Sequence, residues 1–288
     1  MRSIIDTSDD PYVTISFPDR CFSRIHYNAK AVENNGTVVG IKCKDGIVMG
    51  LEKPTCRKMM LSDAVHRGAG MGLEMPACRK MMLSDAVHRG AGMAVAGLGA
   101  DVGAIFTRVK SEAVRYEKVY REPIPVKELA ERVAGYVHFT TLHWWGRPFG
   151  SGVILGGYNR GAPELYMIEP SGLSYRYFGA AIGKGKEAAT KQIEKLNPSE
   201  MTCREGVLEV AKIIYEVNAE VTDGDFELEL SWVCDESKRL HMKVPDELLE
   251  EAKSAARNML LSVKGYHWEI DHKGPSPSIF QFHDDLPC

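Results

Sequence analysis

A tandem duplication is the feature that most constrains what this chain can fold into. Residues Gly50–Met71 and Gly72–Met93 carry the same sequence except at two positions. Stacked repeat proteins need about three or more copies before neighbouring repeats bury a continuous core, and no third copy occurs in the chain. The pair is therefore an insertion into a fold that is not repetitive, and that fold must accommodate 22 surplus residues.

The composition is that of a globular chain large enough for a sizeable core. Its 288 residues are 44% hydrophobic and 26% charged, which suits one domain of up to about 250 residues with extensions. No apolar run approaches the ~18 residues of a spanning helix, and the first residues lack the basic and apolar regions of a secretory signal. We therefore expect a chain that stays inside the cell and has no membrane partner.

Charge and cysteine content narrow the class of partner further. The net charge is −3, and basic residues are mixed with acidic ones rather than gathered into a stripe, so we expect no nucleic-acid partner. Seven cysteines is an odd number, and two of them, Cys56 and Cys78, are copies of each other. This usage is typical of reduced thiols rather than of a disulfide framework.

The periodicity of apolar residues predicts an α+β fold. Helical spacing indicates helices over Arg20–Val32, Asp101–Tyr120, Val126–Leu142, Lys184–Leu196, Cys203–Val217 and Pro245–Leu261. Strand-like runs cover Thr37–Lys44, Ile47–Glu52, Gly92–Gly99, Ser151–Tyr158, Glu164–Glu169, Leu173–Ala180 and Phe226–Val233. Asp45 and Gly46 are a strong hairpin signal between the first two strands. Strands in batches and helices in consecutive pairs predict a four-layer αββα sandwich, in which two sheets lie face to face between helix pairs.

The duplication creates one apparent metal site. Cys56 and His66 recur as Cys78 and His88, and two cysteines with two histidines are a ligand set for tetrahedral zinc. Copying any segment that holds one cysteine and one histidine produces such a set, and the close cysteine pair of zinc modules is missing. We therefore expect no metal at these residues.

A glycine-rich run at Gly179–Lys186 resembles a phosphate-binding loop only superficially. Three residues rather than four separate Gly179 from Gly183, and Gly185 stands where a serine or threonine would hold magnesium. The run is better interpreted as the lead into the helix that follows it. We therefore expect no nucleotide cofactor.

Thr37 is the candidate catalytic residue. A threonine with a free α-amine can act as nucleophile and base together, and here that chemistry would require removal of the 36 residues that precede it. Those residues include the amphipathic helix over Arg20–Val32, which is typical of retained structure rather than of a propeptide. The simpler interpretation is that Thr37 begins a strand, and an autoprocessed N-terminal threonine hydrolase stays the alternative.

Several segments together resemble the α subunits of the 20S proteasome. They are Ala29–Lys53, Gly92–Gly97, Arg147–Gly150, Leu165–Gly172, Ala180–Lys186, Ala211–Val217 and Phe226–Val233. The likeness runs from about Asp10 to Asn258 apart from the insertion, and it implies the αββα sandwich of N-terminal-nucleophile hydrolases. It also implies that Gly36 occupies the nucleophile position of the catalytic β subunits, and that Glu52 replaces their acidic aspartate.

A non-catalytic role follows from this resemblance. Family α subunits form heptameric outer rings on the β rings, dock activators or a regulatory particle, and close the pore of the proteolytic chamber with their N-terminal tails. We therefore expect a scaffolding and gating subunit in ubiquitin-dependent protein breakdown, in the cytoplasm and nucleus and without a cofactor. A misassembled gene product is a third interpretation, motivated by the fresh duplication.

The resemblance also locates two functional surfaces. The gate cluster of the family begins with a tyrosine, but this chain has Asp9 at that position. The activator pocket of the family contains a lysine, but this chain has Leu83 there. The remaining gate residues are Asp10, Pro18 and Tyr27, and the basic residues left near the pocket are Arg79 and Lys80. The implied division is residues 1–19 as a gate tail, 20–263 as the α-subunit domain, and 264–288 as an irregular tail.

The surplus residues are expected between two anchored strands. The hairpin turn anchors the strand before the insertion, and the following helix anchors the strand after it. We therefore expect Gly50–Lys53, rather than its copy Gly72–Met75, to lie in the sheet. Residues 54–86 are expected to protrude, at little cost, because loop-closure entropy grows only as ~(3/2)RT ln n.

Overall fold

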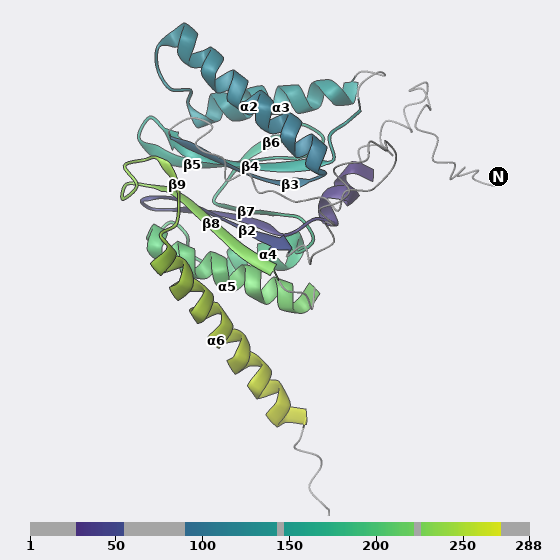
Figure 1. The fold of residues 1–288 in the computed structure, drawn as a ribbon, viewed down its shortest axis with the longest axis vertical. Helices are drawn as coiled ribbons and strands as arrows, with labels where there is room; N and C mark the ends of the chain where they lie inside the picture. Colours follow the sequence, from purple (N-terminus) through teal and green to yellow (C-terminus); the bar gives the residue numbers. More distant parts are fainter. Residues whose placement is uncertain (1–26, 55–89, 143–146, 222–225, 272–288) are drawn as a thin grey trace, which may run out of the picture.

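The structure, a computed structural model, describes residues 27–54, 90–142, 147–221 and 226–271. Two antiparallel sheets lie face to face between two layers of helices (Figure 1). Sheet A contains, in order, β7 (Gly179–Ile182), β1 (Val38–Cys43), β2 (Gly46–Pro54), β8 (Phe226–Cys234) and β9 (His241–Lys243). Sheet B contains β3 (Ala91–Gly97), β4 (Ser151–Asn159), β5 (Ala162–Ile168) and β6 (Ser174–Tyr177).

The helices complete the four layers that the periodicity predicts. Sheet B is covered by α2 (Gly99–Tyr120) and α3 (Val126–Leu142), whereas sheet A is covered by α4 (Lys186–Lys195) and α5 (Cys203–Val221), with α6 (Asp246–Asp271) packed on α5 (Figure 1). The predicted α+β class and αββα sandwich are therefore confirmed. In the described part of the chain, no helix is long and apolar enough to cross a membrane.

Both faces of each sheet are buried, which explains why the central strands are apolar almost throughout. In β1, Val38 faces the other sheet, whereas Val39 and Ile41 face α5, and all three are fully buried. Burial of such side chains contributes about 1.5–3 kcal/mol each. The core thus forms three apolar layers, one between the sheets and one under each helical layer.

The predicted hairpin is confirmed. Cys43 pairs with Gly46 at the end of β1 and β2. A Cβ at Gly46 would lie 2.3 Å from the carbonyl oxygen of Val233, so the approach of β8 leaves space for glycine alone. The Asp45-Gly46 pair therefore sets both the turn and the packing of the next strand.

The two ends of the duplicated region lie in different sheets. Gly50–Lys53, from the first copy, pairs with β8 in sheet A. Ala91–Met93, from the second copy, pairs with β4 in sheet B. The predicted sheet position of Gly50–Lys53 is confirmed, whereas the excursion predicted for residues 54–86 lies almost wholly outside the described residues.

One predicted strand is wrong. Leu173–Ala180 was expected to be a single strand, but the structure has β6 paired with β5 in sheet B and β7 paired with β1 in sheet A. The chain crosses between the sheets at Phe178. A Cβ at Gly179 would lie 2.4 Å from Ile193 Cγ2, so the change from bulky to small residues marks the point where the chain meets α4.

Elements near the two ends of the chain also bear on the prediction. The strand β9 was missed because three residues are too few for a periodic signal. The last helix was predicted to end at Leu261, with an irregular tail from Lys264, but it continues to Asp271; one glycine, Gly265, costs only about 1 kcal/mol in a helix that is already propagating. Of the predicted N-terminal helix, residues 27–33 are described and are helical.

Candidate functional site

Thr37, the candidate nucleophile of the alternative interpretation, lies immediately before β1. Its N–H donates to Glu52 Oε2 (3.0 Å), and its carbonyl oxygen accepts the N–H of Glu52 (2.9 Å). Thr37 is 1% exposed. Its amide is therefore buried and hydrogen-bonded, whereas threonine catalysis requires a free α-amine that a substrate can reach.

The glycine-rich run before α4 closes over Thr37. The N–H of Gly185 donates to Thr37 Oγ1 (3.2 Å), and the N–H of Lys184 donates to the carbonyl oxygen of Asn35 (2.7 Å). A Cβ at Gly185 would lie 1.9 Å from Val217 Cγ1, and one at Gly183 would lie 2.3 Å from a carbonyl oxygen. These glycines allow close packing of the run against the start of β1, which explains their presence without a phosphate.

A buried carboxylate organises the loop that carries the Arg-Pro-Phe-Gly motif. Asp101 is 2% exposed and lies in the first turn of α2, where the helix dipole stabilises a negative charge. Its Oδ1 accepts from the guanidinium of Arg147, and its Oδ2 accepts the N–H of Gly150 (2.9 Å). Because the carboxylate is buried and fully engaged, the motif has a structural role.

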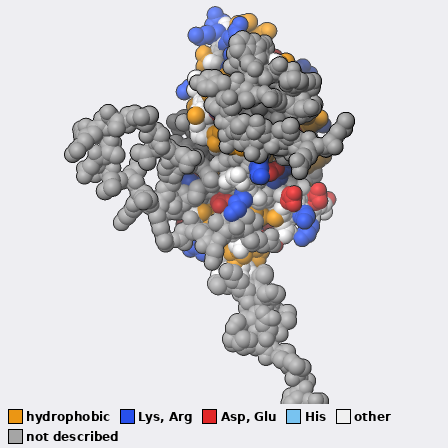
Figure 2. All heavy atoms as spheres, turned by 90° about the vertical axis from the view of Figure 1, so that its right-hand side faces the viewer, with side chains coloured by type: hydrophobic (Ala, Val, Ile, Leu, Met, Phe, Trp, Pro, Cys, Tyr) orange, Lys and Arg blue, Asp and Glu red, His pale blue; other side chains and the backbone are white. Residues whose placement is uncertain are grey.

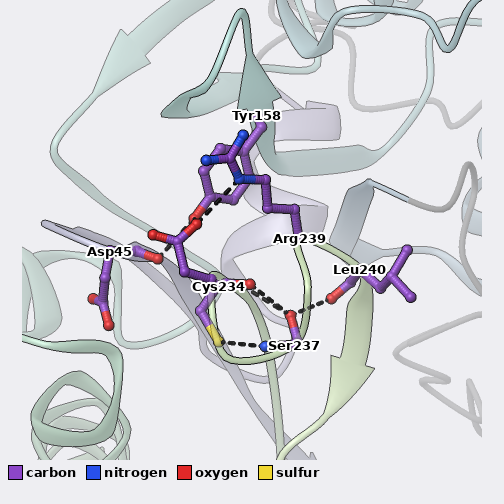
Figure 3. Close-up of polar contacts among 7 residues, drawn as sticks. Asp45, Tyr158, Cys234, Ser237, Arg239 and Leu240 are labelled. Carbon is purple, nitrogen blue, oxygen red and sulfur yellow. Dashed lines mark hydrogen bonds and ion pairs between the residues drawn. The ribbon is translucent and has the colours of Figure 1, made fainter.

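The turns near the Cys43 end of β1, away from Thr37, hold the two sheets together (Figure 3). Tyr158, from β4, donates its hydroxyl to the carbonyl oxygen of Asp45 (2.7 Å). The Arg239 guanidinium stacks on the Tyr158 ring at 4.9 Å and pairs with Asp235 (3.1 Å). Burial, together with the charge of Asp235, raises the pKa of Tyr158. The hydroxyl therefore stays protonated and serves as a donor that links sheet B to sheet A.

Three buried cysteines meet beside this end of the sheet. Cys43, Cys203 and Cys234 are free thiols, and the Cys203 thiol hydrogen-bonds to both of the others, which raises its own pKa. The hydrogen bond from Cys203 lowers the pKa of Cys234 to about 6, and Ser237 donates its N–H to the same sulfur (3.4 Å). Among the described residues no group of histidine, cysteine and acidic side chains is arranged to hold a metal.

An aromatic groove lies between α2 and α3, with a volume of about 740 Å³. Tyr116, Tyr136 and Phe139 line it, and a Cβ at Gly135 would meet nothing within 4 Å. Glu112, buried at the groove, accepts from two arginines, Arg108 (2.7 Å) and Arg132 (3.2 Å). The groove therefore combines an open apolar floor with fixed positive charge.

The surface around the groove is unusually apolar for a helical layer. Figure 2 shows basic and hydrophobic side chains side by side at the end of the molecule that α2 forms. The large apolar residues exposed on these two helices are Val114, Val119, Tyr120, Phe139 and Leu142, at 43–66% exposure. Contiguous exposed apolar surface of this kind marks interaction sites.

The structure describes only part of the sites proposed from the sequence. Tyr27 is 72% exposed, whereas the gate residues Asp10 and Pro18, the pocket residues Arg79 and Lys80, and the four apparent zinc ligands all lie outside the described residues. The sequence reasoning missed the groove between α2 and α3. Its signal was present as Val119 and Tyr120 near the end of the first helix and as Tyr136 and Phe139 in the second.

Comparisons with known proteins agree with the fold. A model of the family described as "Proteasome subunit" matches residues 74–233. The chain is 62% identical over 264 residues to "Proteasome subunit alpha type-3" of Arabidopsis thaliana, covering 90% of this chain and 97% of that protein. It is 61% identical to the protein of the same name from Spinacia oleracea, covering 88% of this chain and 96% of that protein. It is 36% identical to "Probable proteasome subunit alpha type-7" of Saccharomyces cerevisiae, covering 86% of this chain and 82% of that protein.

Proposed function

Because this chain belongs to the proteasome subunit family and is similar to its α subunits, we propose that it is a non-catalytic member of the heptameric outer ring of the 20S core. It occupies the position of the alpha type-3 subunits and acts in ubiquitin-dependent protein breakdown in the cytoplasm and nucleus. The environment of Thr37 carries the non-catalytic part of this proposal. Thr37 is 1% exposed, its amide donates to Glu52 and its hydroxyl accepts from Gly185, so neither group is presented to a substrate.

The apolar surface of α2 and α3 supports assembly with other subunits. Exposed side chains such as Val119 and Tyr120 contribute nothing to the core of this chain, and their burial in a ring contact would stabilise the particle. Neighbouring α subunits and β-ring subunits are the partners proposed for the chain. Activators or a regulatory particle dock on the ring, near Arg79 and Lys80.

Gating is proposed for the N-terminal residues. In this proposal residues 1–19 form the gate tail, with Asp10, Pro18 and Tyr27 as its cluster, on a domain that spans residues 20–263. Exposure of Tyr27 leaves its ring available to residues outside the described chain. An irregular end is proposed only beyond Asp271, since α6 includes residues 264–271.

The alternative, an autoprocessed threonine hydrolase, is supported less well. Cleavage before Thr37 would remove the helical residues 27–33, whose Asn28 and Val32 are buried against the domain. It would also break the bond between Gly36 and Thr37 inside a closely packed region, where a Cβ at Gly36 would lie 2.5 Å from the carbonyl oxygen of Glu52. These contacts favour a retained N-terminus.

The test uses a 20S particle reconstituted from co-expressed subunits that include this chain. We expect Thr37→Ala to leave peptide hydrolysis per assembled particle unchanged, because the hydroxyl only accepts a hydrogen bond from Gly185. Intact-mass measurement should find the chain uncleaved before Thr37. Loss of activity in normally assembled Thr37→Ala particles, or a mature chain that begins at Thr37, would overturn the proposal.

A further inference from the structure

One face of the N-terminal helical segment, residues 27–33, packs on the loop that follows Arg147. We call residues Pro148–Gly152 of this loop the seat. Asn28 is 6% exposed, whereas its neighbour Tyr27 is 72% exposed. The Asn28 side-chain amide donates to the carbonyl oxygen of Pro148 (3.0 Å), across 120 residues of sequence. A buried side-chain donor with one distant backbone acceptor fixes the position of the helix, because its loss leaves a buried carbonyl unpaired.

The same face continues along the loop into β4. A Cβ placed on Gly150 would lie 3.6 Å from Ala31 Cβ, and one on Gly152 would lie 3.5 Å from Val32 Cγ1. Asn28, Ala31 and Val32 stand at helical spacing, so they form a single stripe. These are ordinary van der Waals distances, so the stripe lies within one side-chain layer of this loop.

The loop itself is fixed from the opposite side. The N–H of Leu98 donates to the carbonyl oxygen of Gly150 (3.0 Å), and the N–H of Gly150 donates to Asp101 (2.9 Å). The guanidinium of Arg147 pairs with the same buried carboxylate. The seat is therefore built from the start of α2 and does not depend on the N-terminal segment that it carries.

We propose that Asn28 is a positioning residue, which locks the N-terminal helical segment onto the Pro148–Gly152 seat and thereby sets the point where the gate tail leaves the domain. Most helical stability in proteins comes from packing of one face of the helix, so the seat contributes to the order of residues 27–33. This inference rests on the proposed gating function. It adds one buried hydrogen bond at the base of the proposed gate tail.

The test compares Asn28 with a neighbour on the exposed face. Asn28→Asp keeps the shape of the side chain but has no N–H to donate to Pro148, and Asn28→Ala removes the polar group altogether. Lys30→Ala is the matched control, because Lys30 is exposed. Each variant is placed in the full chain, both isolated and in the reconstituted particle. Hydrogen exchange of residues 27–33 and peptide hydrolysis without activator are then measured.

We expect both Asn28 variants to speed exchange of residues 27–33 by about tenfold, the size expected when a buried hydrogen bond is lost. Peptide hydrolysis without activator should rise several-fold, and Lys30→Ala should change neither quantity. Unchanged exchange in both Asn28 variants would overturn the positioning role. Faster exchange without a rise in hydrolysis would overturn its link to the gate. If the unaltered chain does not enter a particle, the proposed function fails, whereas exchange in the isolated chain still tests the seat.

Discussion

The two helical layers of this protein differ on their outer faces and not on their inner ones. Beneath the layer of α2 and α3, Ile105 and Leu129 are fully buried, and beneath the layer of α4 to α6, Val210 and Ile214 are buried as completely. The outer face of α2 and α3 exposes large apolar side chains, whereas the described side chains of α4, α5 and α6, which end at residue 260, include no large exposed apolar one. Both layers therefore stabilise the domain, and among these side chains it is α2 and α3 that present a surface that another chain could bury.

The charged groups on the two helical layers also differ in their surroundings. At the groove on the α2 and α3 side, Glu112 is buried between two arginines, an arrangement that positions charge beside aromatic rings. On the α5 and α6 side Lys212 pairs with Glu209 and Lys253 with Glu250, each within one helix, and Arg204 pairs with Glu236, an exposed residue that follows β8. Surface pairs of this kind contribute little to stability, about 0–1 kcal/mol, and keep the face solvated.

The largest expected effect comes from placing a charge on the outer face of α2 and α3, which we call the apolar layer. Val119→Asp should reduce incorporation into the reconstituted particle at least about tenfold, because burying an unpaired carboxylate in a subunit contact is costly. The isolated chain should become more soluble. Asn258→Asp, which adds the same charge to the exposed face of α6, is the control. Equal incorporation of the two variants, measured by mass spectrometry of purified particles, would contradict the assignment of the interface.

The second prediction concerns close packing between β2 and α5, beneath the helical layer of α4 to α6. A Cβ at Gly50 would lie 2.4 Å from Val210 Cγ1 and 2.9 Å from Ile214 Cδ1. Gly50→Ala should therefore lower the free energy of unfolding by about 1–3 kcal/mol, the usual range for overpacking. Urea unfolding of the isolated chain measures this change. An unchanged urea midpoint would mean that β2 and α5 can move apart without a loss of stability.

The third prediction uses glycines on the apolar layer, where added atoms meet open space. A Cβ at Gly103 in α2 or at Gly135 in α3 would have nothing within 4 Å. Alanine at either position should raise the free energy of unfolding by about 0.5–1 kcal/mol, because glycine is the poorer helix former. Only Gly135 lines the groove, so only Gly135→Ala should also weaken incorporation. Equal effects of both variants on incorporation would remove the groove from the interface.

The smallest expected effect is a pH dependence on the sheet under the apolar layer. Burial raises the pKa of Glu164, but hydrogen bonds from Asn159, Tyr166 and Arg176 outweigh it and hold that pKa below its ordinary value. A lowered folded-state pKa adds stability that is present above the ordinary carboxyl pKa and is lost as the pH falls through the folded value. Glu164→Gln should therefore lessen the loss of stability on acidification, by less than about 1 kcal/mol.

Thermal unfolding of both chains from pH 7 to pH 3 measures that difference. The two melting temperatures should differ most near neutral pH and converge as Glu164 becomes protonated. Parallel curves over this range would show that the carboxylate contributes the same free energy in the folded and unfolded chains.

Local signals in the sequence determined the elements that depend on neighbouring residues. The Asp45-Gly46 turn placed β1 and β2, and the helical spacing of apolar residues located α2, α3 and α5. The anchored strand at Gly50–Lys53 was predictable for the same reason, since the turn that holds it is only four residues away. From these elements the order of layers followed, because only a sandwich buries both faces of two sheets.

Only the tertiary structure decided features that depend on contacts between distant segments. The run Leu173–Ala180 became two strands because β5 and β1, which pair with its two ends, lie in different sheets. Asn28 became a positioning residue because the loop at Pro148 is brought beneath it, 120 residues away in sequence. Spacing along a chain predicts which residues share a face, but hydrogen bonds and packing across segments depend on distances that the fold alone creates.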